Sequence, residues 1–160
     1  MSLKFNIRHL EPHNLTLMGE LSVADLELES LDELIHFEEP LSYDLELQKL
    51  ENAVLAQGKL RLLLHCECAR CLKPFERPLC LNHWTAHLPL KGEEKVEVVN
   101  DLVDLTPFIR EDIVLSLPQQ PLCGAECKGL PGASKKLGSG GLEKKDPASS
   151  AWAELNKLKL

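Results

Sequence analysis

Two apolar segments on either side of a short turn, residues 53–68 and 75–90, restrict the fold of this 160-residue chain more than any other feature. Long strands joined by so few residues pair antiparallel with each other. The first segment, A-V-L-A-Q-G-K-L-R-L-L-L-H-C-E-C, contains Gly58, where we expect a bulge or bend. Its run from Leu60 to Leu64 is too apolar for a clean alternation and indicates burial on both faces. We therefore predict one long hairpin with the turn C-A-R-C-L-K-P at its tip.

Two segments nearer the N-terminus alternate leucine with acidic residues. The sequences V-A-D-L-E-L-E at 23–29 and S-Y-D-L-E-L-Q-K-L at 42–50 both have the period of a half-buried strand. Residues 31–39 between them predict either a short helix or an irregular loop, ended by Pro40. A further strand is expected at 95–99, where two valines alternate with charge.

One helix is predicted over residues 107–117. Thr106 is the expected N-cap, and Pro107 follows at the first helical position, where its missing N–H costs nothing. The apolar residues recur at helical spacing, and the intervening charged residues Arg110, Glu111 and Asp112 are expected to face water. Pro118 ends the helix. We expect this amphipathic helix to pack on one face of the sheet.

The predicted fold class is α+β, with a predominantly antiparallel β-sheet or a partly closed barrel. Residues 1–127 form one β-rich domain in this interpretation. Residues 128–160 are rich in Gly, Ser and Lys, which predicts a flexible basic tail. Trp152, Leu155 and Leu158 share one helical face, so a short helix at 149–158 is expected to end the tail.

The charge of the chain is unevenly distributed. Residues 1–60 hold 12 acids and 4 bases, whereas residues 121–160 hold 4 acids and 7 bases, within a formal net charge of -7. This distribution argues against broad nucleic-acid binding, which needs a basic surface. A contact with RNA or another partner is instead expected to be local, at the cationic residues Arg70, Lys73, Lys128, Lys135, Lys136, Lys144 and Lys145.

The first residues, MSLKFNIRHLEPHNL, are interrupted by charges and lack the long apolar run of a secretory signal. Nor does any stretch approach the roughly 20 apolar residues that span a bilayer. The sequence therefore predicts a cytoplasmic chain with no membrane partner. In a reducing compartment its six cysteines are expected to be thiols or metal ligands rather than disulfides.

Four of these cysteines have the spacing of metal ligands. Cys68 and Cys71 form a C-x-x-C pair, and Cys123 and Cys127 form a C-x3-C pair. Four thiolates from two such loops make a closed, structural zinc site with no position open for catalysis. Free cysteines are the alternative interpretation, and a thiol redox pair is the third, although a thioredoxin-like C-x-x-C opens a helix after a strand. One structural zinc ion is the only cofactor that the sequence suggests.

No catalytic constellation is visible. The chain has no G-x-S-x-G, no G-x-x-x-x-G-K and no H-E-x-x-H, and its acids alternate with leucine as solvated-face residues do. The sequence therefore predicts a protein that is not an enzyme and has no small-molecule substrate.

Two further patterns are the turn C-A-R-C-L-K-P-F and the later segment D-L-T-P-F-I-R-E-D-I-V-L-S-L-P-Q-Q-P-L-C. The first resembles the C-x-R-C-L-x-P turn, and the second the acidic helix followed by cysteine, of the bacterial YceD family, the large ribosomal RNA subunit accumulation proteins. C-K-G-L and the later D-P also fit, so the resemblance covers most of residues 42–160. Many members continue C-K-G-L into C-P-x-C-G, whereas this chain reads L-P-G-A-S and lacks both of those cysteines.

The resemblance implies a cytosolic protein that supports accumulation of large-subunit ribosomal RNA through RNA processing or ribosome assembly, with no known enzymatic activity. The expected partner is therefore ribosomal RNA of the large subunit or a basic ribosomal protein, whose charge would complement the acidic N-terminal third. A structural zinc domain for protein interaction and a thiol redox protein are the alternative functions.

Overall fold

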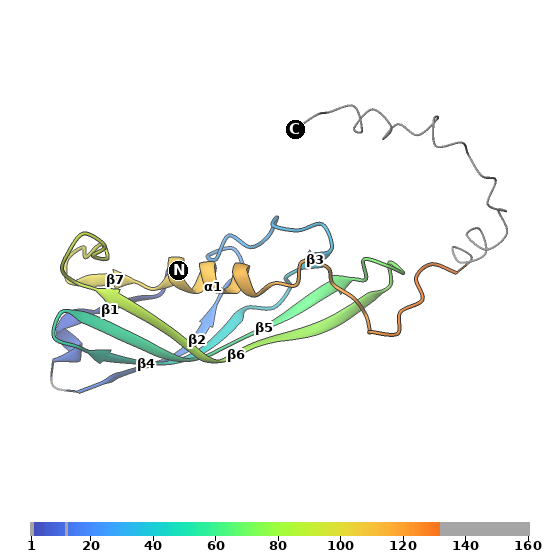
Figure 1. Cartoon of the computed structure of the whole chain (residues 1–160). Helices are drawn as coiled ribbons and strands as arrows, with labels where there is room; N and C mark the ends of the chain where they lie inside the picture. The colour runs from blue at the N-terminus through green and yellow to red at the C-terminus, as the bar shows by residue number, and fades with distance from the viewer. Residues whose placement is uncertain (1, 12, 132–160) are drawn as a thin grey trace, which may run out of the picture.

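A computed structural model describes residues 2–11 and 13–131 of the chain. Most of these residues form an antiparallel sheet, with one α-helix and a small second sheet on one side of it (Figure 1). The elements in chain order are β1 (Lys4–Asn6), the 3-10 helix η1 (Ile7–Leu10), β2 (Leu15–Leu21), β3 (Ile35–His36), β4 (Leu41–Lys49), β5 (Ala53–Glu67), β6 (Pro74–Pro89), β7 (Leu102–Asp104) and α1 (Thr106–Ser116).

Strands β5 and β6 form the predicted hairpin. They pair antiparallel from Ala53 opposite Pro89 to Glu67 opposite Pro74, so the cysteine turn lies at the tip. The other edge of β5 is shared by β4 and, nearer the tip, by β3. β2 pairs with the far edge of β4. No further strand among the described residues pairs with β2 or β6, so the sheet is open and the predicted barrel alternative is wrong.

Gly58 is where the register of the hairpin shifts, as predicted. Its φ is +156°, and a Cβ added there would lie 2.1 Å from the carbonyl oxygen of Asp44. Only glycine lets the backbones of β4 and β5 approach this closely. The predicted two-sided burial at 60–64 is wrong, because Arg61 is exposed and Leu63 is only half-buried on the face that no helix covers.

The predicted strand at 23–29 is also wrong. Residues 23–27 form consecutive turns, with Glu27 at a φ of +50°, and both Leu26 and Leu28 are fully buried. Backbone hydrogen bonds from Leu26 to Ser22 and from Leu28 to Val23 close the turns. The alternation therefore reflects which side chains are buried in the core. It does not indicate an extended backbone. Of the two predictions for residues 31–39, the irregular loop is correct, apart from the short strand β3.

Helix α1 packs on the inner face of the sheet through the buried residues Ile109 and Ile113. The indole Nε1 of Trp84 donates to Asp112 Oδ2 at 2.6 Å, which joins α1 to β6. Arg110 Nε donates to the carbonyl of Leu26 at 3.0 Å. Arg110 and Asp112 are therefore not the water-facing residues that the pattern predicts, although Glu111 is exposed.

The start of α1 differs from the predicted cap. Thr106 is helical, and its Oγ1 accepts a hydrogen bond from the backbone N of Leu3 at 2.8 Å. Asp104 Oδ1 accepts from the backbone N of Thr106 at 2.9 Å instead. The threonine thus holds the N-terminal segment, and the N-cap residue, Leu105, makes no side-chain capping hydrogen bond.

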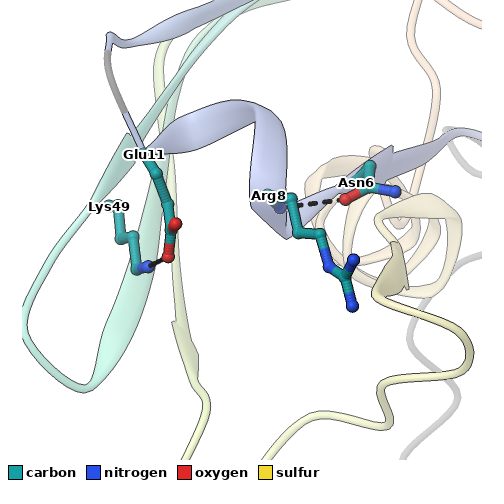
Figure 2. Close-up of polar contacts among 4 residues, drawn as sticks. All are labelled: Asn6, Arg8, Glu11 and Lys49. Carbon is teal, nitrogen blue, oxygen red and sulfur yellow. Dashed lines mark hydrogen bonds and ion pairs between the residues drawn. The ribbon is translucent and has the colours of Figure 1, made fainter.

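The small sheet pairs β1 with β7, with Phe5 opposite Val103. The predicted strand at 95–99 is wrong, since only a single bridge at Val99 interrupts an irregular segment there. η1 follows β1, and Asn6 Oδ1 accepts from the backbone N of Arg8 at 2.9 Å (Figure 2). An ion pair between Glu11 and Lys49 then joins the end of this segment to β4.

The predicted C-terminal helix at 149–158 lies outside the described residues. Among the residues that are described, no helix is long and apolar enough to cross a membrane. The α+β class, the antiparallel hairpin and the helix on the sheet are otherwise as the sequence predicts.

Candidate metal centre

The sulfur atoms of the two predicted cysteine pairs meet at the tip of the hairpin. Those of Cys68, Cys71, Cys123 and Cys127 all lie within 4.8 Å of one another. Cys68 Sγ lies 3.7 Å from Cys127 Sγ, and Cys71 Sγ lies 3.7 Å from Cys123 Sγ. A tetrahedral site with Zn–S bonds of about 2.3 Å has sulfur–sulfur distances of about 3.8 Å. The cluster is therefore close to the size of a ZnS4 centre.

The first pair is held by the turn between β5 and β6. The backbone N of Cys68 donates to the carbonyl of Lys73 at 3.0 Å, and that of Leu72 donates to the carbonyl of Cys68 at 2.9 Å. Leu72 has a φ of +59°, a conformation that costs a residue with a Cβ about 1 kcal/mol or more. These bonds curl the turn so that both sulfurs lie on the same side.

The second pair follows α1 on a loop that returns to the tip. The backbone N of Cys127 donates to the carbonyl of Gly124 at 3.2 Å and closes a turn. The backbone N of Ala69 donates to the carbonyl of Pro121 at 2.8 Å, which joins this loop to the hairpin turn. Pro121 is buried. The cysteine spacing indicates the candidate ligands. It does not indicate the bond from Ala69 to Pro121, because no residue pattern predicts a single backbone hydrogen bond between distant loops.

The protonation of the cluster is uneven. Backbone N–H groups, first that of Cys123 and then that of Cys71, lower the pKa of the Cys68 thiol to about 6. Hydrogen bonds from the Cys123 thiol to its sulfur neighbours, Cys127 foremost, raise the pKa of Cys123 to about 12. Because like charges this close repel, the four thiols do not all ionise together unless a cation is present.

The donor set fits a structural zinc ion. Four thiolates are the ligands of closed zinc sites, and their number leaves no coordination position for a substrate or water. Cys68 is fully buried and Cys71 nearly so, whereas Cys127 is half-buried and Cys123 is exposed at the rim. Zinc held by these residues would join the hairpin tip to the chain after α1. The remaining cysteines, Cys66 and Cys80, are not part of the cluster.

Three of the predicted partner-contact residues border this centre. Arg70 and Lys73 lie in the hairpin turn and Lys128 follows Cys127, and all three are exposed. Each lies within two residues of one of the clustered cysteines. The others, Lys135, Lys136, Lys144 and Lys145, lie outside the described residues.

The cysteine turn, helix α1 and the C-K-G-L segment all fall within one family match. The family described as large ribosomal RNA subunit accumulation protein YceD matches residues 56–159. The chain belongs to the YceD family. The matched region contains all four clustered cysteines and the hairpin residues from Ala56 onward.

Curated relatives of this YceD-family chain come from mycobacteria. Uncharacterized proteins of Mycobacterium bovis and of two Mycobacterium tuberculosis strains, CDC 1551 and H37Rv, are each 29% identical over 127 residues. The match covers 74% of this chain and 61% of each relative, so the chain spans about three-fifths of their length. No solved structure matches the chain.

Proposed function

We propose that this chain is a non-enzymatic factor that supports the accumulation of large-subunit ribosomal RNA by binding that RNA or a ribosomal protein. The family match over residues 56–159 carries the proposal, since the family description states that role. Such a role is exercised in the cytoplasm, where ribosomes are assembled.

The sulfur cluster supports a structural part in this function. One zinc ion held by Cys68, Cys71, Cys123 and Cys127 would fix the hairpin tip, and the ion would supply no open coordination position. The exposed side chains of Arg70, Lys73 and Lys128 would then be held in a fixed arrangement. Cationic side chains on a rigid loop are suited to contact phosphate groups of RNA.

A thiol redox function is the second candidate, because the lowered pKa of Cys68 would favour its thiolate. A redox thiolate must also be reached by its substrate, and Cys68 is fully buried. A redox dithiol needs only the two sulfurs of the C-x-x-C turn, whereas two more sulfurs from a second loop lie beside them. Four clustered sulfurs suit a metal site better. We therefore favour the structural role.

The test is complementation of a bacterium from which its own YceD-family gene has been deleted. The ratio of large-subunit to small-subunit ribosomal RNA is measured with this chain, with Cys80→Ser and with the double variant Cys68→Ser/Cys123→Ser. The chain and Cys80→Ser are expected to restore the ratio, and the double variant is expected to fail. A deletion strain whose ratio is normal, or is not changed by the chain, would contradict the proposal.

A further inference from the structure

The two faces of the main sheet differ in what covers them. Helix α1 and the turns at residues 22–34 lie over the inner face, and β1 and β7 lie on that same side (Figure 1). No described residue covers the outer face, on which Asp44 of β4 lies opposite Lys59 of β5. We use the name open face for this outer surface of β2, β4, β5 and β6, together with β3 and the adjoining residues 38–40.

The open face carries an excess of negative charge. Four shallow hollows, of about 280 to 360 Å³ each, lie on this face from its β2 side to the hairpin tip. Their linings contain seven carboxylates but only two cationic side chains, Lys59 and Arg61. Glu76 forms an ion pair with His65, at 3.8 Å, which neutralises its charge only when the histidine is protonated. This surface repels phosphate and attracts cations.

The same hollows also offer apolar surface. Leu63 and Pro78, which are paired across β5 and β6, line one hollow beside Glu20 and Arg61. Met18, with 71% of its surface exposed, lines another beside Asp44. Lysine and arginine side chains pack their aliphatic stems on apolar surface while their charged ends seek carboxylates. The mixture therefore fits a basic polypeptide better than it fits a nucleic acid.

We propose that the open face is the docking surface for a lysine- and arginine-rich polypeptide segment of a partner protein. The proposal deepens the proposed function and rests on it only for the expectation that the partner is ribosomal. The centre of the open face, where Asp44 lies opposite Lys59, is nine residues or about 30 Å along the strand from Cys68 at the tip. The cationic residues at the tip would then contact RNA, and the open face would contact protein.

The test measures binding of a fluorescein-labelled peptide, about twenty residues long and rich in arginine and lysine, to the full chain by fluorescence anisotropy. The face variant is Glu20→Gln/Asp44→Asn/Glu46→Gln, in which the new amide at position 46 keeps an acceptor oxygen for the hydrogen bond that Asn14 donates to Glu46. The matched control is Glu93→Gln/Glu94→Gln/Glu97→Gln, which removes three exposed carboxylates after β6. Circular dichroism verifies that both variants are folded.

The face variant is expected to bind the peptide about fivefold more weakly, and the control within about twofold of the unmodified chain. The variant Lys59→Gln/Arg61→Gln is expected to bind more tightly, and binding should weaken as salt increases. Equal affinity for the face variant and the control would overturn the proposal. The proposal would also be overturned if the chain bound a single-stranded RNA of about twenty nucleotides more tightly than the peptide and the face variant lost this RNA binding. The peptide assay contains no ribosome, so a negative result would overturn the docking surface alone. The proposed function would still be tested separately by the ribosomal RNA ratio in cells.

Discussion

The Sγ atoms of Cys71 and Cys123 lie 3.7 Å apart although the two residues are 52 positions apart in the sequence. One belongs to the turn of the β5–β6 hairpin and the other to the loop that follows α1. The contact therefore ties the sheet to the chain beyond the helix. Zinc at this point would constrain the same two segments more strongly than hydrogen bonds alone.

The purified chain is expected to contain one equivalent of zinc when it is produced in zinc-supplemented medium. Cys123→Ser should lose most of this zinc and unfold at a lower temperature, because three thiolates hold a structural ion less tightly than four. Elemental analysis and thermal unfolding measure the two effects. Cys80→Ser is the control, since Cys80 is exposed and outside the cluster. Folded protein with zinc far below one equivalent would contradict the metal site.

The affinity for zinc should rise with pH. The pKa of the Cys123 thiol is raised to about 12, so binding at neutral pH must displace at least this proton. Each displaced proton increases the apparent affinity about tenfold for each pH unit below the pKa of the thiol. Competition with a chromophoric chelator between about pH 6 and pH 8 measures the slope. An affinity that does not change over this interval would be inconsistent with thiolate ligation.

Gly58→Ala should destabilise the sheet by about 2 kcal/mol or more, because the new Cβ meets the backbone of β4, which cannot move aside. Gly19→Ala is the matched control within β2. Its Cβ would have its nearest contacts with the hydroxyl end of the Tyr43 side chain, which can shift more easily than backbone. Urea unfolding compares the two variants. A loss of less than about 0.5 kcal/mol for Gly58→Ala would show that glycine is not required at the bulge.

Asp112→Ala should lower the free energy of unfolding by about 1–3 kcal/mol, because it leaves the nearly buried indole N–H of Trp84 without its acceptor. Asp112→Asn keeps an acceptor oxygen and should recover part of the loss. Glu111→Ala, on the exposed side of α1, should change stability by less than about 0.5 kcal/mol. A cost for Glu111→Ala equal to that for Asp112→Ala would mean that the indole bond does not stabilise the helix on the sheet.

The sequence predicts those parts of the fold that depend on local patterns. Pairing of β5 with β6 follows from two long apolar segments and a short turn, and the bulge follows from Gly58. The pattern at residues 23–29 misleads because a strand and a series of turns can bury the same two leucines. Local spacing carries no information on which of the two occurs, since tertiary packing decides it.

The same limit applies to the candidate site. The spacings of the cysteines indicate four candidate ligands, but only the fold shows that both pairs reach one point. The bond from Ala69 to the carbonyl of Pro121 and the left-handed conformation of Leu72 are set by contacts between distant segments. Asp112 likewise looks like a solvated helix residue until Trp84 is placed beside it.

Crosslinking in living bacteria, followed by identification of the bound RNA and protein, tests the central claim most directly. We expect enrichment of large-subunit ribosomal RNA or of a ribosomal protein over a mock isolation. RNA recovery should fall in Arg70→Gln/Lys73→Gln/Lys128→Gln but not in Lys4→Gln/Lys91→Gln/Lys95→Gln, whose side chains are exposed away from the hairpin tip. Recovery of neither large-subunit ribosomal RNA nor any ribosomal protein above background would contradict the account.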